Sequence, residues 1–173
     1  FIIGEKFIGK NKVAMILGDN FFYGQSLTEK LKECTKLHTG AKVFLHPVSN
    51  PSQYGVIKLN KKNKILRIVE KPKTYLSNLA ITGLYFFDNQ VVKLAKNLKI
   101  SKRKEYEIVD LLKKYNNKNK LTVEFIGRGG AWLDAGSIKD IYDASSFVSA
   151  LENRQGLKIA CLEEIAFRNG WIN

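Results

Sequence analysis

The sequence contains few of the residues that bind structural metals or form disulfides. Its 173 residues include two cysteines, Cys34 and Cys161, and two histidines, His38 and His46. Neither cysteine belongs to a CxxC pair, so zinc and disulfide frameworks are not expected. No apolar run approaches the ~20 residues of a membrane-spanning helix, and nothing resembles a signal peptide. These absences predict a protein of the reducing cytoplasm with no membrane partner.

Acidic residues are scarce relative to basic ones. The chain has 29 lysines and arginines against 16 aspartates and glutamates, a formal charge of +13, which invites a nucleic-acid interpretation. However, 24 of the basic residues are lysines scattered over every segment, whereas surfaces that read bases cluster arginines and exposed aromatic rings. We therefore expect no nucleic-acid partner, although the positive field favours small phosphorylated ligands.

Apolar periodicity predicts strands that alternate with helices. This pattern indicates an α/β fold with a Rossmann-like mixed sheet flanked by helices. We expect one partial domain over residues 1–173, with a C-terminal helical segment from about residue 137. The predicted strands are 13–18, 41–48, two within 56–72, 80–88 and 121–127, and the predicted helices are 26–40, 89–98, 107–115, 137–155 and 163–171.

Side chains with capping chemistry mark the predicted helix ends. Ser26 and Glu29 have the spacing of a capping box, and Gly40 is a candidate helix terminator. Asp88 and Ser137 precede two further helices and are expected to cap them.

Two aspartates follow predicted strands and are candidate metal ligands. In "ILGDN", Asp19 comes directly after the first strand, and in "GRGGAWLDAGS", Asp134 precedes a capped helix. A turn is the alternative at each position. Ligands of α/β sheets sit beyond the carboxyl ends of strands. Two carboxylates converging there would repel by roughly 4 kcal/mol at ~4 Å and an effective dielectric near 20, so they would need a shared proton or a cation such as Mg²⁺.

Three weaker signals accompany the aspartates. In "VEKP", Glu70 and Lys71 are adjacent, so an extended strand would point them to opposite sides. Either they form a plain surface pair, or one binds ligand hydroxyls and the other a phosphate. "QYGV" offers Gly55 for a close backbone approach, and "AITG" places Thr82 in an apolar strand.

Taken in order, "LGDNFFYG", "QYGV", "VEKP", "AITGLYFFD", "YEIVD", "GRGGAWLDAGS" and "ENRQGLKIACLEEIAFRNGWI" resemble the glucose-1-phosphate thymidylyltransferases. These sugar nucleotidylyltransferases join dTTP and glucose 1-phosphate into dTDP-glucose, the first step toward dTDP-rhamnose. "WLDAG" and "LGDN" are shared across the superfamily, whereas the final stretch is specific for the thymidylyl enzymes. The resemblance implies the nucleotide-diphospho-sugar transferase type of fold.

The resemblance implies a role for each matching residue. Asp19 and Asp134 would hold Mg²⁺, and Lys71 would contact the sugar phosphate. The glucosyl pocket would be lined by Asn20, Gly55, Glu70 and Ile81, the last in place of the family's usual valine. A second nucleotide site, for feedback inhibition of a homotetramer, would include Tyr23, Gly24, Arg128, Glu164, Ile165 and Arg168.

The family's N-terminal glycine-rich loop, which cradles the triphosphate, has no counterpart in this sequence, nor has the family's tail beyond "EEIAFR". We therefore expect an N-terminally truncated piece of the enzyme that does not turn over dTTP by itself. Transfer from UTP or CTP is one alternative, and a truncated, non-catalytic assembly or regulatory copy is another.

Overall fold

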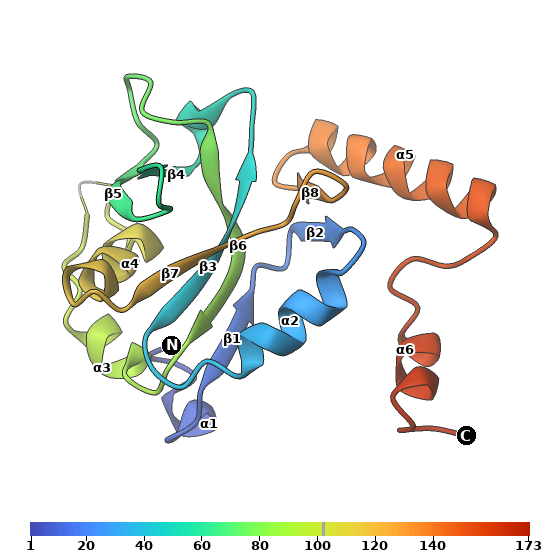
Figure 1. Cartoon of the computed structure of the whole chain (residues 1–173), viewed down its shortest axis with the longest axis horizontal. Helices are drawn as coiled ribbons and strands as arrows, with labels where there is room; N and C mark the ends of the chain where they lie inside the picture. The colour runs from blue at the N-terminus through green and yellow to red at the C-terminus, as the bar shows by residue number, and fades with distance from the viewer. Residues whose placement is uncertain (102) are drawn as a thin grey trace. The chain divides into compact units, whose positions relative to one another are not determined.

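The computed structural model describes residues 1–101 and 103–173, which divide into two compact units (Figure 1). The first unit is Phe1–Trp132 and the second is Leu133–Asn173. The elements are α1 (Glu5–Ile8), β1 (Val13–Ile16), β2 (Asn20–Tyr23), α2 (Leu27–Thr35), β3 (Ala41–Pro47), the short 3₁₀ helix η1 (Pro51–Gln53), β4 (Gly55–Leu59), β5 (Ile65–Glu70), β6 (Leu79–Phe87), α3 (Val91–Lys96), α4 (Ile108–Asn117), β7 (Leu121–Phe125), β8 (Ala131–Asp134), α5 (Ile138–Gln155) and α6 (Leu162–Arg168).

Strand β6 is the centre of a six-stranded mixed sheet. The strand order is β5-β4-β6-β3-β7, and β1 also pairs with β6. Strands β1, β3 and β4 run antiparallel to β6, while β7 runs parallel to β3. The mixed α/β sheet predicted from the sequence is therefore confirmed. Strand β2 pairs with β8 in a separate two-stranded ribbon.

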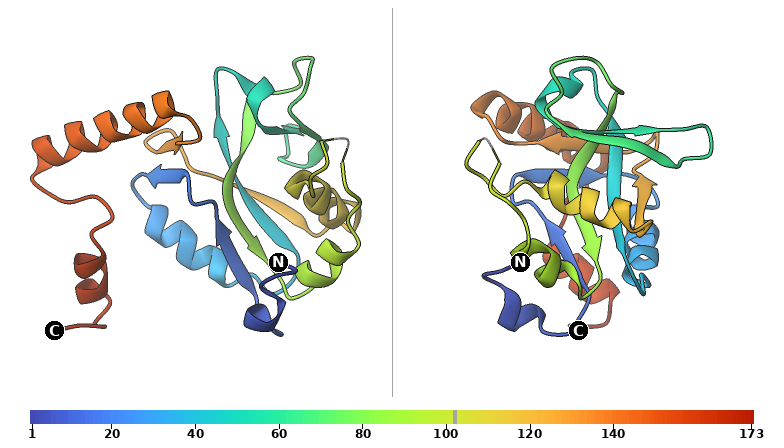
Figure 2. Two further views of the ribbon diagram at one scale, coloured as in Figure 1. Left: turned by 180° about the vertical axis from the view of Figure 1, so that it is seen from behind. Right: turned by 90° about the vertical axis from the view of Figure 1, so that its left-hand side faces the viewer.

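The two faces of the sheet carry separate apolar clusters because side chains alternate along β6. Ile81, Tyr85 and Phe87 belong to the cluster that includes Leu111 and Tyr115 of helix α4. Leu84 and Phe86 belong to the other cluster, with Cys34 of helix α2. Figures 1 and 2 accordingly show α4 and α2 on opposite sides of the sheet. With both faces covered, β6 reads as an almost continuous apolar run.

The second unit contains helices α5 and α6. Ser137 precedes α5, and its hydroxyl accepts a hydrogen bond from the Asp140 backbone N–H at 3.2 Å. This is the N-cap that the sequence predicts. Gly156 ends the helix with a φ of 67°, a left-handed conformation that glycine adopts readily.

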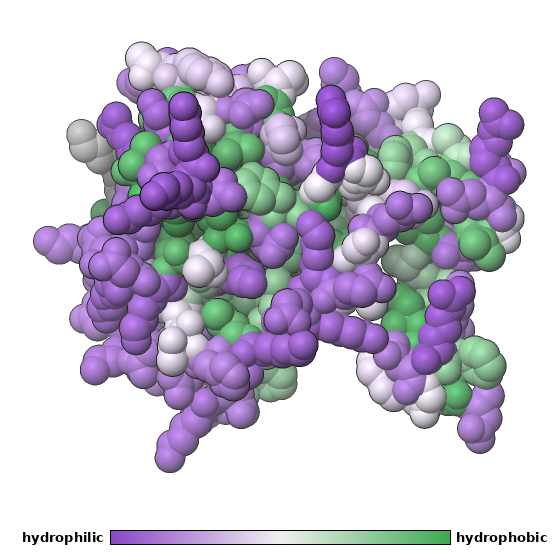
Figure 3. Space-filling view, viewed as in Figure 1, coloured by the Kyte–Doolittle hydropathy of each residue, from purple (hydrophilic) through white to green (hydrophobic). Residues whose placement is uncertain are grey.

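Hydrophilic side chains dominate the surface in Figure 3, with smaller apolar patches between them. This distribution agrees with lysines spread over solvated faces. Among the described residues, no helix combines the length and apolar character needed to cross a bilayer.

Two predicted helix ends are wrong. Ser26 makes no capping bond, because its backbone is left-handed with a φ of 61°. Helix α2 ends at Thr35 rather than at Gly40. Gly40 instead lies before β3 with a φ of 92°, where an added Cβ would come within 2.3 Å of the Lys120 carbonyl oxygen. Close backbone packing, not helix termination, explains this glycine.

Asp88 joins the ends of four elements through a buried carboxylate. Its Oδ1 accepts hydrogen bonds from the Gln90 N–H at 3.0 Å and the Tyr115 hydroxyl at 2.8 Å, and its Oδ2 accepts one from the Gly40 N–H at 2.6 Å. The predicted cap of the following helix is thus part of a larger network. Burial and the neighbouring Asp88 charge raise the pKa of Tyr115, so its hydroxyl stays a donor.

Replacing Asp88 by asparagine should destabilise the fold by about 3 kcal/mol, because an amide group would face N–H donors in a buried site. Urea unfolding of the Asp88→Asn and wild-type proteins would measure the difference. Asp143→Asn makes the same chemical change at an exposed position of α5 and should shift stability by less than about 0.5 kcal/mol. Equal effects of the two substitutions would contradict the role of Asp88.

Candidate functional site

One edge of β6 is shared by two strands and leaves a gap between them. Strand β4 pairs at Ala80, and β1 pairs from Leu84 to Phe87. We call residues 81–83 the β6 gap. The loop after β1 fills part of it, because the Leu17 N–H donates to the Gly83 carbonyl oxygen at 2.9 Å. The candidate residues Asp19 and Asn20 are held directly beside this edge.

The Asn20 side chain bridges the β6 gap and the neighbouring aspartate. Its Oδ1 accepts hydrogen bonds from the Gly83 N–H at 2.9 Å and the Trp132 indole N–H at 2.6 Å. Its Nδ2 donates to Asp19 Oδ1 at 2.9 Å. Asp19 itself is exposed and lies in the turn before β2. Asp19 therefore does lie in a turn, and within that turn the Asn20 amide orients its carboxylate.

Three predicted pocket residues from three strands meet on one side of the sheet. Gly55 pairs with Glu70 in the β4–β5 register. A Cβ added at Gly55 would lie 3.0 Å from Glu70 Oε2 and 3.3 Å from Ile81 Cδ1. It would also lie 2.8 Å from Val109 Cγ2, so helix α4 packs against this group on one face of the sheet. Any side chain larger than that of glycine at position 55 would displace these neighbours.

The pocket group and the Asn20 group contact neighbouring positions of β6. Ile81 and Gly83 are two residues apart, so they point to the same face of the strand. A Cβ added at Gly83 would come within 2.5 Å of Asn20 Oδ1, so the amide packs directly on this glycine. The Asn20 amide and Ile81 are thus attached to neighbouring positions of β6, and a shared pocket of Asn20, Gly55, Glu70 and Ile81 stays a prediction.

Arg103 is a neighbour of this group that the sequence analysis did not identify. Its guanidinium lies 3.4 Å from Glu70 and 3.7 Å from Glu107, and it also pairs with Glu105 at 3.1 Å. The ExE spacing of Glu105 and Glu107, close behind an arginine, was the available signal. This spacing does not stand out in the sequence, because most residues of "SKRKEYE" are charged.

Burial raises the pKa of the Glu70 carboxyl above its ordinary value of 4.5. The charge of Glu107 acts in the same direction, while Lys71 and Arg103 act against it. Burial also raises the pKa of Tyr85, with a further contribution from Glu70. A half-buried carboxylate whose charged form is disfavoured gains from hydrogen-bond donors, which a bound ligand with hydroxyl groups would provide.

Lys71 lies outside the strand, which corrects the expectation of alternating side chains. Strand β5 ends at Glu70, and Lys71 has a φ of 42°. Its backbone N–H donates to the Tyr54 carbonyl oxygen at 3.0 Å, which stabilises the turn. A non-glycine residue in left-handed backbone costs of order 1 kcal/mol, and such residues cluster at functional sites.

Asp134 is the last residue of β8 and belongs to the second unit. Its pairing with Asp19 at one metal stays a prediction. Within the part of the chain that the structure describes, no three carboxylate, histidine or cysteine side chains are grouped to hold a metal ion. Any cation at Asp19 would thus take further oxygen ligands from phosphates or water, as Mg²⁺ commonly does.

Comparison with known proteins identifies the family. A family model described as "Nucleotidyl transferase" matches residues 1–150. The chain belongs to the nucleotidyl transferase family. It is 50% identical to a glucose-1-phosphate thymidylyltransferase of Neisseria meningitidis and 47% identical to that of Mycobacterium tuberculosis. Both matches cover all 173 residues but only 60% of the relative's length.

Solved members of the family have the same fold. A protein from Bacillus anthracis, assigned as a glucose-1-phosphate thymidylyltransferase and solved with a sucrose, is 36% identical with a TM-score of 0.74. The match covers 84% of this chain and 57% of that one. A UDP-glucose pyrophosphorylase solved with UDP-glucose is 25% identical, also with a TM-score of 0.74, over 84% and 59% of the two chains. The predicted nucleotide-diphospho-sugar transferase fold is confirmed.

The residues predicted for a second nucleotide site are divided between the two units of the chain. Gly24 packs against the Arg128 turn, since a Cβ on Gly24 would come within 2.9 Å of Gly130 Cα. Tyr23 ends β2 beside them. In the second unit, Glu164, Ile165 and Arg168 share helix α6, where Arg168 pairs with Glu164 at 2.5 Å.

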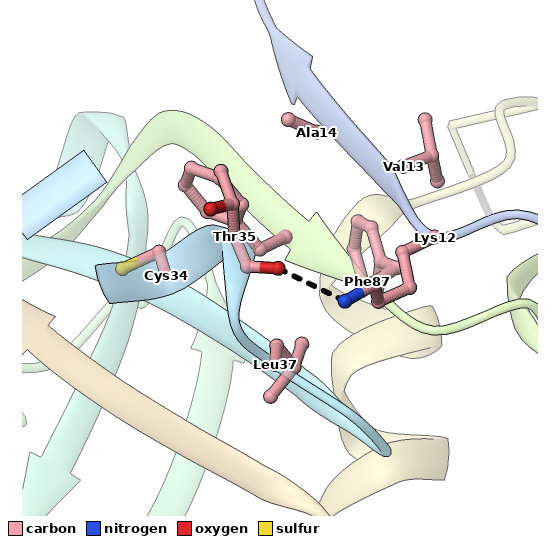
Figure 4. A pocket seen from close by; sticks show the side chains of 8 residues that line it. Lys12, Val13, Ala14, Cys34, Thr35, Leu37 and Phe87 are labelled. Atoms are coloured by element: carbon pink, nitrogen blue, oxygen red, sulfur yellow. Dashed lines mark hydrogen bonds between the residues drawn. The ribbon is translucent and has the colours of Figure 1, made fainter. Parts of the chain in front are cut away.

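A separate cavity of about 200 Å³ lies between β1, α2 and β6 (Figure 4). Lys12 donates to the Thr35 carbonyl oxygen at its rim, at 3.0 Å, and Cys34 and Leu37 also line it. Burial raises the pKa of the Cys34 thiol, so it is a poor nucleophile and packs as a small apolar residue.

Replacing Glu70 by glutamine should stabilise the protein at neutral pH, because it removes a charge whose burial is unfavourable. The folded-state pKa is raised, so the unfolded chain loses this proton first and stability falls as pH rises above about 4.5. Glu70→Gln should therefore be more stable than wild type at pH 7, with no advantage at pH 4. Urea unfolding at both pH values would measure this.

Glu105→Gln is the matched control, because Glu105 pairs with the same Arg103 from a more exposed position. We expect less than about 0.5 kcal/mol of change at either pH. A Glu70→Gln protein that is less stable than wild type at pH 7 would show that the Arg103 ion pair outweighs the burial of the charge.

Proposed function

We propose that this chain is the sugar-binding and metal-binding part of a glucose-1-phosphate thymidylyltransferase. The reaction joins dTTP and glucose 1-phosphate into dTDP-glucose and releases pyrophosphate. The observation that carries the proposal is the close packing of Gly55 against Glu70 and Ile81, near the position of β6 where the Asn20 amide binds Gly83. The 50% identity to a thymidylyltransferase over the whole chain supports the choice of substrates.

Glucose 1-phosphate would bind along this face of β6. Glu70 would accept hydrogen bonds from sugar hydroxyls, since its half-buried carboxylate gains from neutral donors. Ile81 would supply an apolar wall, and Gly55 would let a ligand approach the backbone closely. Lys71 would place its ammonium group against the sugar phosphate, which its position directly after Glu70 allows.

The proposed oxygen ligands would suit a magnesium ion. Asp19 is an exposed carboxylate held by Asn20, and Asp134 is the second carboxylate that the family resemblance provides. Two carboxylates with phosphate oxygens form a ligand set that Mg²⁺ prefers. When bound, the ion would neutralise phosphate charge and align the two phosphates.

The reaction needs alignment rather than a covalent enzyme intermediate. A phosphate oxygen of glucose 1-phosphate forms a bond to the α-phosphorus of dTTP, and the bond from that phosphorus to the bridging oxygen breaks. Pyrophosphate leaves with the electron pair of the broken bond. The residues of this chain would hold the attacking phosphate in line and offset its charge, which are the main contributions of proteins to phosphoryl transfer.

The same proposal extends to the location, assembly and regulation of the enzyme. We infer a cytoplasmic enzyme, because its substrates are intracellular phosphorylated metabolites, and a homotetramer with a regulatory nucleotide site at Tyr23, Gly24, Arg128 and the α6 residues. Large apolar side chains exposed on the second unit support self-association. They include Ile141, Tyr142, Leu162, Phe167 and Trp171.

Activity should depend on both aspartates. Because the chain spans about 60% of its relatives' length, the assay uses the protein of the complete reading frame. With dTTP, glucose 1-phosphate and Mg²⁺, pyrophosphate release should fall by about 100-fold or more in Asp19→Asn and in Asp134→Asn, since each loses a charged metal ligand. Asp143→Asn, on the exposed surface of α5, should keep wild-type activity.

The same assay separates the alternatives. Faster reaction with UTP or CTP than with dTTP would identify another sugar nucleotidylyltransferase. A wild-type protein that folds but releases no pyrophosphate with any of the three nucleotides would favour a non-catalytic assembly or regulatory copy.

Self-association should depend on the apolar surface of the second unit. Phe167→Glu and Tyr142→Glu would place charges among apolar side chains that are 64% and 72% exposed, and should shift the complete protein from a tetramer to smaller species. Sedimentation measurements would show the change. A wild-type protein that sediments as a single chain would rule out the tetramer.

A further inference from the structure

Trp132 differs from the other tryptophan of the chain in having a buried and bonded indole. It is 8% exposed, whereas Trp171 is 73% exposed. Its ring contacts Tyr54 edge-on, with centroids 5.1 Å apart, and His46 with centroids 6.4 Å apart. A buried indole N–H requires an acceptor, and here that acceptor is Asn20 Oδ1 at 2.6 Å.

The two donors on Asn20 Oδ1 determine the orientation of its amide. The Trp132 N–H and the Gly83 N–H both point at one end of the group, so that end must be the oxygen. The opposite end is then the NH₂ group, and Asp19 Oδ1 accepts from it at 2.9 Å. A reversed amide would set its NH₂ against two donors and its oxygen against a carboxylate. Both ends therefore favour the same orientation.

The backbone around Asn20 is fixed independently of Trp132. The Asn20 N–H donates to the Leu17 carbonyl oxygen at 3.1 Å, and the Leu17 N–H donates to the Gly83 carbonyl oxygen at 2.9 Å. The loop therefore has its own attachment to the β6 gap. Loss of the indole N–H should thus affect the side-chain amide more than the position of the loop.

We propose that Trp132 is a positioning residue, which fixes the amide of Asn20 and through it orients the Asp19 carboxylate for the metal. This inference rests on the proposed function, because it assigns Asp19 the role of metal ligand. Outer residues that orient metal ligands commonly change metal affinity by 10–100-fold when they are lost.

Trp132→Phe tests the proposal, because it keeps an aromatic ring in the cluster and removes the N–H. In the complete protein, we expect the Mg²⁺ concentration for half-maximal activity to rise about 10-fold. The KM for dTTP at saturating Mg²⁺ should change by less than about 2-fold, since the substitution leaves nucleotide contacts in place. Trp171→Phe is the matched control and should leave both values unchanged.

A double variant distinguishes positioning from general stability. In an Asn20→Ala background the amide is absent, so Trp132→Phe should raise the Mg²⁺ requirement no further. Additive effects, or an unchanged requirement in Trp132→Phe alone, would overturn the proposal. If Trp132→Phe does not fold, Gly83→Ala replaces it, because the new Cβ would push directly on Asn20 Oδ1 while Trp132 stays intact.

A measurement without turnover addresses the same contact. In NMR spectra, the Asn20 side-chain NH₂ resonances should move in Trp132→Phe and stay in place in Trp171→Phe, and the Trp132 indole proton should exchange with solvent far more slowly than that of Trp171. Asn20 resonances that do not move in Trp132→Phe would overturn the proposal. An inactive wild type would remove the proposed function, and these resonances would still decide whether Trp132 orients the amide.

Discussion

The packing of β6 is the constraint on which the candidate site depends. Both faces of the strand are covered by apolar clusters, and both edges are hydrogen-bonded, so its nine residues have little freedom. One edge passes from β4 to β1 across the β6 gap, and the polar groups of Gly83 need partners there. The loop at Leu17 and the Asn20 amide satisfy them. The same contacts that complete the sheet therefore place Asn20, and Asp19 beside it, at a defined position.

Much of the fold could be predicted because its long elements have strong patterns. The continuous apolar run of β6, the helical spacing in α4 and the cap at Ser137 are local signals of burial and hydrogen bonding. Strands β2 and β8 were missed, since each has four residues and its pairing is determined by tertiary structure. The capping box at Ser26 failed for a related reason: its spacing was suitable, but the turn from β2 imposes a left-handed backbone.

The sequence predicts which residues belong to the candidate site better than it predicts how they contact one another. Gly55, Glu70 and Ile81 could be named from family resemblance, but their contact depends on the β4–β5 register and on Val109 of α4. Arg103 was missed because the nearby ExE spacing points to Glu105 and Glu107 as its partners, whereas its ion pair with Glu70 joins residues 33 positions apart. Asp19 was identified by its place after a strand, whereas its orientation by Asn20 required the hydrogen-bond network.

The left-handed backbone of Lys71 has a consequence for how this sequence can change over evolutionary time. Glycine or asparagine would adopt a φ of 42° more readily than lysine does, so folding stability alone favours their replacement of it. A gene copy under no selection for its chemistry would lose nothing by that exchange and would gain stability. Loss of the lysine in a copy of this gene would therefore indicate that the copy no longer needs its ammonium group.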